Sequence, residues 1–212
     1  MIEIKNQFAR HSLLWIWVLP LALVFLTPAV VDREQMRVPR EEVKTMLLLG
    51  QDAERVTRRA DALYQSMFVA TGAIGWTQKL LTSQGKSTDP VFFRNLARET
   101  RKYHDNLWNM VYRAVWRLAG LWPTFLTLML ALALPALIDG LVVRAKKVDM
   151  FRSHNPVFFW SAGHLFVMVM VMGVFLVLPL LPFTISISIL YGAVAAIALA
   201  LWVTASNFQT GV

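Results

Sequence analysis

Three long apolar segments between Leu118 and Ala205 constrain the fold of this chain more than any other feature of its sequence. The first two are joined by a basic turn at 144–152, and a further apolar run, Ser12–Val31, lies near the start of the chain. A hydrocarbon layer about 30 Å thick takes roughly 20 apolar residues of helix to cross. Lipid offers a backbone no hydrogen bonds, so the segments inside it must be helices. We therefore expect an all-α membrane protein with four transmembrane helices and a helical extramembrane domain between the first and second spans.

The overall composition supports this fold class and excludes several kinds of site. Of the 212 residues, 57% are hydrophobic, which is seldom seen in a water-soluble domain of this length. No cysteine is present, so disulfides, thiolate metal sites and cysteine nucleophiles are excluded. The formal net charge is +8. Beside membrane spans, basic residues more often set topology and contact anionic lipid than bind nucleic acid. We expect contact with membrane lipids and no direct binding of nucleic acid.

The apolar pattern predicts three parts. Residues 1–31 form a cytoplasmic start and a first anchor, 32–117 form the extramembrane domain, and 118–212 form a bundle of three membrane helices. The run Ser12–Val31 is longer than the roughly 7–15 residues of a signal peptide core, which favours an uncleaved anchor.

Within the bundle, the spans are expected at about 118–143, 157–181 and 184–205. The turn at Pro182 and Phe183 between the last two spans carries no charge, and this predicts a close helical hairpin. In the extramembrane domain, Asp89 and Pro90 are a typical helix start. Because no helix breaker follows before Gly120, this helix is expected to continue directly into the second span.

The basic residues also predict an orientation. Two groups are separated by an even number of spans and so lie on one side: Lys5 and Arg10, and the loop residues Arg144, Lys146, Lys147 and Arg152. The positive-inside rule makes that side cytoplasmic. Arginines that flank the long loop, among them Arg113 and Arg117, oppose this assignment. Acidic residues share their neighbourhood, however, and long segments translocate largely regardless of charge. We expect both termini in the cytoplasm and the loop domain outside.

Two ionisable residues, Asp139 and His164, fall inside predicted spans. Such groups are costly in lipid and usually face a bundle interior, water or a partner. They could form a proton relay, a metal site or a catalyst, or a polar clasp in which Asp139 accepts a hydrogen bond from His164. One Asp and one His are too few for a convincing metal site, and no activated nucleophile lies nearby. We favour a structural role, either the clasp or the extension of the Asp139 side chain to the interface beside Gly140, and we expect no catalytic residues, no metal and no cofactor.

Small residues recur at helical spacing in the last span, at Gly192, Ala196 and Ala200. Small residues on one face let another helix approach closely. The partner could be the third span, which we favour, or another subunit, and the second case would give a homo-oligomer.

The order of these features resembles a family of bacterial membrane proteins encoded by integrating conjugative elements and related plasmids. The shared parts are an N-terminal anchor, a helical loop, the passage Pro135–Lys147 and a later apolar segment with Ser161-Ala-Gly-His164. The most specific part is Ile138-Asp139-Gly140-Leu141 with the basic residues that follow. Members tend to be encoded near the coupling ATPase of conjugative type IV secretion. The resemblance therefore implies an inner-membrane role in DNA transfer, and it implies no catalytic residues.

Three functional classes follow. We favour a non-enzymatic subunit that binds or stabilises the coupling ATPase, with Arg144, Lys146, Lys147 and Arg152 contacting acidic protein surfaces or lipid. The alternative is a small transporter or channel component that uses Asp139 and His164. An intramembrane enzyme is disfavoured, because only one credible polar pair is present.

Overall fold

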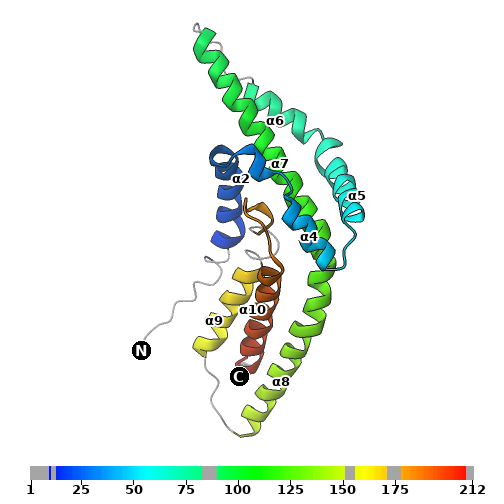
Figure 1. Cartoon of the computed structure of the whole chain (residues 1–212). Helices are drawn as coiled ribbons and strands as arrows, with labels where there is room; N and C mark the ends of the chain where they lie inside the picture. The colour runs from blue at the N-terminus through cyan, green and yellow to red at the C-terminus, as the bar shows by residue number, and fades with distance from the viewer. Residues whose placement is uncertain (1–9, 11–12, 83–89, 151–155, 171–177, 209–212) are drawn as a thin grey trace. The chain divides into compact units, whose positions relative to one another are not determined.

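The computed structural model describes residues 10, 13–82, 90–150, 156–170 and 178–208, and within these ranges the chain is helical and contains no strand. The prediction of an all-α protein is confirmed for this part of the chain. The α-helices, labelled in Figure 1 where there is room, are α2 (Leu19–Val30), α3 (Arg33–Met36), α4 (Arg40–Leu48), α5 (Ala53–Tyr64), α6 (Ala73–Thr82), α7 (Pro90–Leu128), α8 (Leu134–Asp149), α9 (Pro156–Val167) and α10 (Ile187–Ser206).

Two π-helical turns in the apolar segments have a common sequence cause. The turn Leu14–Val18 ends two residues before Pro20, and the turn Met129–Ala133 ends two residues before Pro135. Proline has no backbone N–H and so cannot make the usual helical bond to the carbonyl four residues earlier. In each turn, the residue just before the proline donates its N–H to a carbonyl five residues back. This shift lets the helix continue past the proline.

The predicted long helix is present. α7 begins at Pro90 and passes Gly120 without interruption. Through the π-helical turn it is continuous with α8, so that a single helix covers Asn95–Asp149.

Two described helices are long and apolar enough to cross a membrane, judged by length and composition alone: Asn95–Asp149, of 55 residues, and Ile187–Ser206, of 20 residues. Two further apolar helices, Ile16–Val30 and Val157–Met170, are shorter. They fall within the predicted first and third spans, but residues 171–177 of the third lie outside the described residues. The predicted count of four spans therefore stays a prediction.

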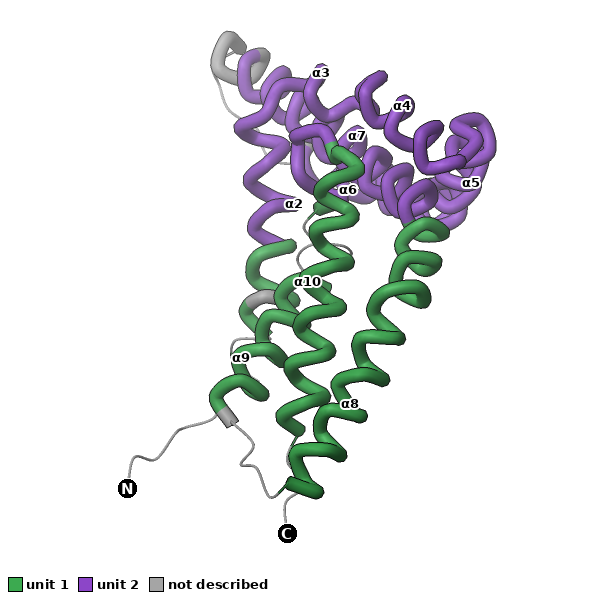
Figure 2. The backbone as a smooth tube through the Cα atoms, turned by 60° about the horizontal axis from the view of Figure 1, so that its bottom comes forward, with its two compact units in different colours: residues 1–20, 122–178, 185–212 green, residues 21–121, 179–184 purple. Residues whose placement is uncertain are grey.

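The chain divides into two compact units whose boundaries differ from the predicted parts (Figure 2). One unit comprises Met1–Pro20, Trp122–Leu178 and Ile185–Val212, and the other comprises Leu21–Leu121 and Pro179–Thr184. The second unit thus contains the expected extramembrane domain, most of α2, and the turn expected between the last two spans. We call them the apolar unit and the loop unit.

In the loop unit, α4 and α5 lie against α7. Met46, Val56 and Ala60 are almost fully buried, and so is Met110 of α7. The closest approach is at Gly120, where a Cβ atom would lie 2.7 Å from the sulfur of Met46 and 3.1 Å from a methyl group of Val56. A methyl group here would require the flexible end of the Met46 side chain to shift, so glycine favours the close packing of α4 on α7.

The apolar unit is organised around α10, which packs on α8 and α9. Its buried face repeats at helical spacing through Leu190, Val194, Ile197 and Ala200. Gly140 of α8 faces this helix at close range, since a Cβ atom there would lie 2.8 Å from the carbonyl oxygen of Trp202. At Gly140, α8 therefore approaches the backbone of α10 directly.

Candidate functional site

The principal polar site of the loop unit is a buried ion-pair cluster between α7 and α4. Arg113 and Arg117 lie one turn apart on α7 and are 3% and 0% exposed, and Glu42 of α4 is 1% exposed. Arg113 Nη2 lies 2.6 Å from Glu42 Oε1, and Arg117 Nε donates to Glu42 Oε2 over 3.1 Å. Arg117 Nη2 also donates to Oε1. Arginine's planar fork suits this bidentate geometry.

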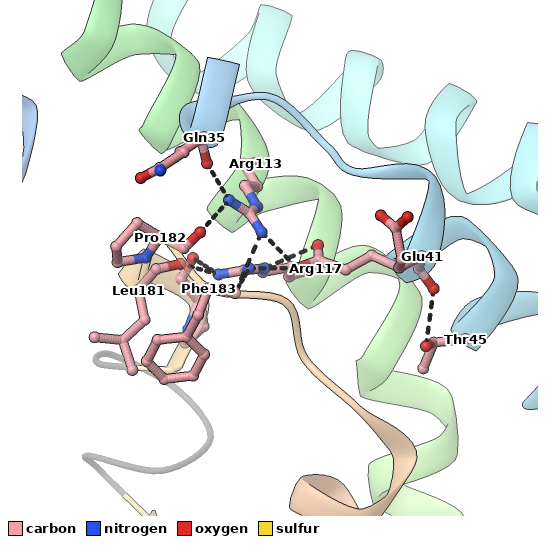
Figure 3. Close-up of polar contacts among 10 residues, drawn as sticks. Gln35, Glu41, Thr45, Arg113, Arg117, Leu181, Pro182 and Phe183 are labelled. Atoms are coloured by element: carbon pink, nitrogen blue, oxygen red, sulfur yellow. Dashed lines mark hydrogen bonds and ion pairs between the residues drawn. The ribbon is translucent and has the colours of Figure 1, made fainter. Parts of the chain in front are cut away.

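Both guanidinium groups also bind the turn expected between the last two spans, as Figure 3 shows. Arg117 donates to the carbonyl oxygens of Pro179 at 2.9 Å and of Leu181 and Phe183 at 2.6 Å. Arg113 donates to the carbonyls of Pro182 and Phe183 at 2.9 and 3.2 Å, and also to that of Gln35. An irregular segment has no helix or sheet partners for its carbonyls, and these two side chains supply them.

The same helix binds the end of α2. The hydroxyl of Tyr103 donates to the carbonyl oxygen of Phe25 at 3.1 Å. Asn106, which is fully buried, donates through Nδ2 to the carbonyls of Pro28 and Val31, both at 3.1 Å. The last carbonyls of a helix lack partners within the helix. Polar side chains of α7 thus donate hydrogen bonds to backbone carbonyls at the ends of two apolar segments that are far apart in the sequence.

The electrostatics of the cluster keep Glu42 ionised. Burial alone would raise the pKa of this carboxyl group, but hydrogen bonds from Arg117 and Arg113 and their positive charges outweigh it, so the pKa is lowered from 4.5. A charged carboxylate between two guanidinium groups joins α4 to α7 as an ion-pair clamp.

In the apolar unit, Asp139 has a different partner from the one predicted. The indole Nε1 of Trp202 on α10 donates to Asp139 Oδ2 at 2.7 Å. His164 Nδ1 lies 2.7 Å from the carbonyl oxygen of Trp160 on its own helix. Among the described contacts, none joins Asp139 to His164. Asp139 and Gly140 are therefore neighbouring parts of the α8–α10 seam.

The basic loop was predicted at 144–152, but α8 continues to Asp149, so Arg144, Lys146 and Lys147 lie near the end of this helix, in different environments. Lys147 Nζ donates to the carbonyl of Ser206 and to Asn207 Oδ1, both at 3.1 Å, at the carboxyl end of α10. The guanidinium carbon of Arg144 lies 5.2 Å from the ring centre of Phe208. Lys146 is exposed, and Arg152 lies outside the described residues. Lys147 thus favourably caps the negative end of a helix dipole.

Comparison with known proteins decides the family. The model of the family described as "IncC plasmid conjugative DNA transfer protein DtrJ-like" matches residues 25–209, which is most of the chain. The chain belongs to the DtrJ-like family. No curated protein and no solved structure matches the chain. The predicted association with bacterial conjugation is confirmed, whereas the link to integrating elements and to a coupling ATPase stays a prediction.

The predicted small-residue face of this DtrJ-like chain is only partly turned inward. Ala200 is buried, Ala196 is half-buried and Gly192 is exposed. A Cβ atom at Gly192 would meet no atom of the described residues within 4 Å. In contrast to Gly140, Gly192 therefore makes no close helix contact within the described part of the chain, and both predicted partners of this face stay predictions.

Sequence reasoning did not identify the Arg113–Arg117–Glu42 cluster. It treated both arginines as loop charges at the start of a span. A signal was present, because two arginines four residues apart lie on one helical face beside an apolar span. What the sequence lacked was their partner, since Glu42 is 75 residues from Arg117. Among the described residues, no group of three or more metal-ligating side chains is assembled in the DtrJ-like chain.

Proposed function

We propose that this DtrJ-like protein is a non-enzymatic inner-membrane subunit of a bacterial conjugative DNA-transfer apparatus, and that it binds or stabilises the coupling ATPase. The observation that carries the proposal is the family match over residues 25–209. The polar sites of the protein make structural contacts. The arginine cluster binds backbone carbonyls, and Asp139 accepts a hydrogen bond from an indole. This supports a role in assembly over a transport pathway through Asp139 and His164, which is the alternative.

The exposure of the apolar helices supports a membrane location. In the two helices that are long enough to span, only 11% and 22% of the most apolar window is buried. A core helix of a soluble protein would be covered by protein, and large exposed apolar surfaces require a membrane or a partner. Lipid is the cover that we propose.

The contacts of the segment ends support the proposed arrangement of four spans. Within the loop unit, Asn106 of α7 holds the end of α2 and Arg117 holds the turn 179–184. Within the apolar unit, Lys147 near the end of α8 holds the end of α10. Four spans that cross in alternating directions would bring together these same ends, whichever side the termini lie on. Arg113 and Arg117 are buried, so they no longer count among the exposed positive charges that would oppose a cytoplasmic location of both termini.

Lys146, near the end of α8, is the residue that we propose for contact with an acidic surface of the ATPase, because it is exposed whereas Lys147 caps α10. The test is to tag the full chain on its own conjugative plasmid, extract it in mild detergent and quantify the co-purified coupling ATPase. The variant Lys146→Glu should lower both ATPase recovery and mating frequency. Lys44→Glu, an equal charge change at an exposed residue of α4, should leave both unchanged.

Two results would contradict the proposal. Equal ATPase recovery with both variants would show that Lys146 is not part of the interface. Absence of the ATPase from the purified wild-type sample would show that it is not the partner. Reporter fusions after Ser83 and Val148 test the orientation separately: a fusion after Val148 should be active in the cytoplasm and one after Ser83 in the periplasm.

A further inference from the structure

Contacts between α5 and α7 place each residue of α5 at a known position along the long helix. The contacts, in order along α5, are those of Val56 with Gly120, of Thr57 with the indole of Trp116 and of Asp61 with the hydroxyl of Tyr112. Residue numbers rise on α5 while they fall on α7, so the two helices are antiparallel (Figure 1). α7 leads into the predicted second span. α5 therefore starts beside the beginning of that span and runs away from it.

α4 lies the other way round, parallel to α7. Glu42 pairs with Arg117, and Met46, one turn later on α4, lies against Gly120. α4 ends at Leu48, two residues beyond Met46 and so about 3 Å further along at 1.5 Å per residue. The second span is predicted to begin just before Gly120. The end of α4 and the turn that follows it therefore lie beside the first residues of the predicted span.

The end of α4 exposes two large apolar side chains at this position. Leu47 is 56% exposed and Leu48 is 76% exposed. Apolar surface is stabilised when it leaves water, and the boundary between headgroups and acyl chains accepts such side chains. Two exposed carboxylates at the start of α5, those of Asp52 and Glu54, limit how deep the turn can go, because charges are costly in hydrocarbon. A shallow position in the bilayer surface suits both kinds of side chain.

α5 presents three exposed arginines at helical spacing on one flank, Arg55, Arg58 and Arg59. Among the described residues, none of the three forms an ion pair. Arg58 and Arg59 directly follow Thr57, the partner of Trp116, so they lie slightly further from the span than that indole. A headgroup layer is about 5–7 Å thick, or roughly four residues of helix, and it would extend from the start of the span to these arginines. Their long side chains can therefore reach lipid phosphates.

We propose that the turn between α4 and α5 docks on the surface of the membrane that the chain spans. Leu47 and Leu48 lie at the boundary between headgroups and acyl chains, and Arg58 and Arg59 bind lipid phosphates, for which the guanidinium fork is well suited. The inference rests on the membrane location proposed above. Docking holds the loop unit against the bilayer through a second contact, in addition to its covalent connection to the spans.

Spin labels measure the depth of this turn. The chain contains no cysteine, so a nitroxide can be attached to a single introduced cysteine in the full chain. Three exposed positions are compared in vesicles of phosphatidylethanolamine and phosphatidylglycerol: Leu48→Cys in the turn, Leu130→Cys in the predicted second span and Ala62→Cys on α5 beyond the arginines. Paramagnetic resonance then compares collisions of each label with oxygen, which concentrates in lipid, and with a water-soluble nickel chelate.

The label at Leu48 should collide more with oxygen than with the chelate, as at Leu130, and the label at Ala62 should show the reverse. Adding Arg58→Gln and Arg59→Gln should raise collisions of the Leu48 label with the chelate about twofold or more, because each basic residue near an anionic surface favours the bound state. The same charge change at Arg98 and Arg101 is the matched control. These exposed residues lie roughly 30 Å from Gly120 along α7, and their substitution should leave the Leu48 label unchanged.

The three labels separate the two proposals. A label at Leu48 that is as accessible to the chelate as the one at Ala62, with Leu130 in lipid, would overturn the docking and leave the membrane location intact. Access of the chelate to all three labels would contradict the membrane location, and with it both proposals. Equal effects of the two double substitutions would overturn the binding of phosphates by Arg58 and Arg59.

Discussion

Arg117 and Glu42 lie 75 residues apart in the sequence and form a bidentate ion pair in which both side chains are almost fully buried. The pair joins the long helix α7 to the short helix α4. Because Arg117 also donates to the carbonyls of Pro179, Leu181 and Phe183, one side chain holds three segments of the loop unit together.

Breaking this pair should destabilise the loop unit. Arg117→Gln would leave Glu42 with reduced charge compensation and several turn carbonyls without a donor, and removal of one partner of a buried pair typically costs about 3–5 kcal/mol. Arg33→Gln, which removes an exposed pair with Asp105, should cost less than about 1 kcal/mol. Denaturant unfolding in detergent, followed by circular dichroism, measures both. Equal losses would contradict the central role of the cluster.

The stability of the loop unit should depend on acidic pH. The pKa of Glu42 is lowered on folding, so the charged form stabilises the folded state fully well above pH 4.5, the value for an unperturbed glutamate. This contribution should be lost as the pH falls from 4.5 through the lower folded pKa. Melting temperatures measured between pH 7 and pH 3 should decline more steeply for the wild type than for Glu42→Gln. Parallel pH profiles would show that Glu42 is not the group responsible.

A methyl group at Gly140 should separate α8 from α10. A Cβ atom there would lie 2.8 Å from the backbone oxygen of Trp202 and 2.9 Å from Cβ of Ala205, so Gly140→Ala should cost about 1–3 kcal/mol. Gly192→Ala is the matched control, since open space surrounds that position. It should change stability by less than about 1 kcal/mol. Thermal unfolding in detergent compares them, and a destabilising Gly192→Ala would indicate that this face is covered by another subunit.

Variants of Asp139 and Trp202, which share a hydrogen bond, distinguish a packing role of Asp139 from a role in a proton pathway. Asp139→Asn keeps an oxygen that can accept from the indole, so mating frequency should stay near the wild-type level. Asp139→Leu and Trp202→Phe both remove the bond, and both should lower mating and the amount of folded protein. A proton pathway would give the reverse order, with Asp139→Asn inactive and Trp202→Phe active. Immunoblots of membrane fractions control for expression.

Substitutions of the neighbouring residues Lys146 and Lys147, near the end of α8, should have different effects on stability. Lys147→Met removes the donor to the carboxyl end of α10 and should destabilise that end by about 0.5–1 kcal/mol. Lys146→Met should have no such effect, because that side chain is exposed. Hydrogen exchange of the amides at 203–207 measures the difference. Faster exchange with Lys146→Met than with Lys147→Met would contradict the assignment of the cap.

Much of the helical structure followed from local properties of the sequence. Apolar runs of helical length, Pro90 at a helix start and the absence of a breaker before Gly120 are all read within a few residues of the position concerned. They predicted the all-α fold and the uninterrupted α7. The passage with Asp139 and Gly140 was also singled out from the sequence, which offered His164 as a possible partner of Asp139, whereas the structure gives Trp202.

The tertiary structure decided which distant groups meet. Hydrogen bonding and close packing depend on separations of a few ångströms between side chains that the sequence leaves tens of residues apart. Only the folded structure could therefore show that Glu42 pairs with Arg113 and Arg117. The same holds for the hydrogen bond from Trp202 to Asp139. The structure also showed that Arg113 and Arg117, which the sequence suggested were loop charges, are buried and donate hydrogen bonds to the carbonyls of a turn. Local sequence determined that this DtrJ-like chain forms long apolar helices, and long-range contacts determined how their ends are held.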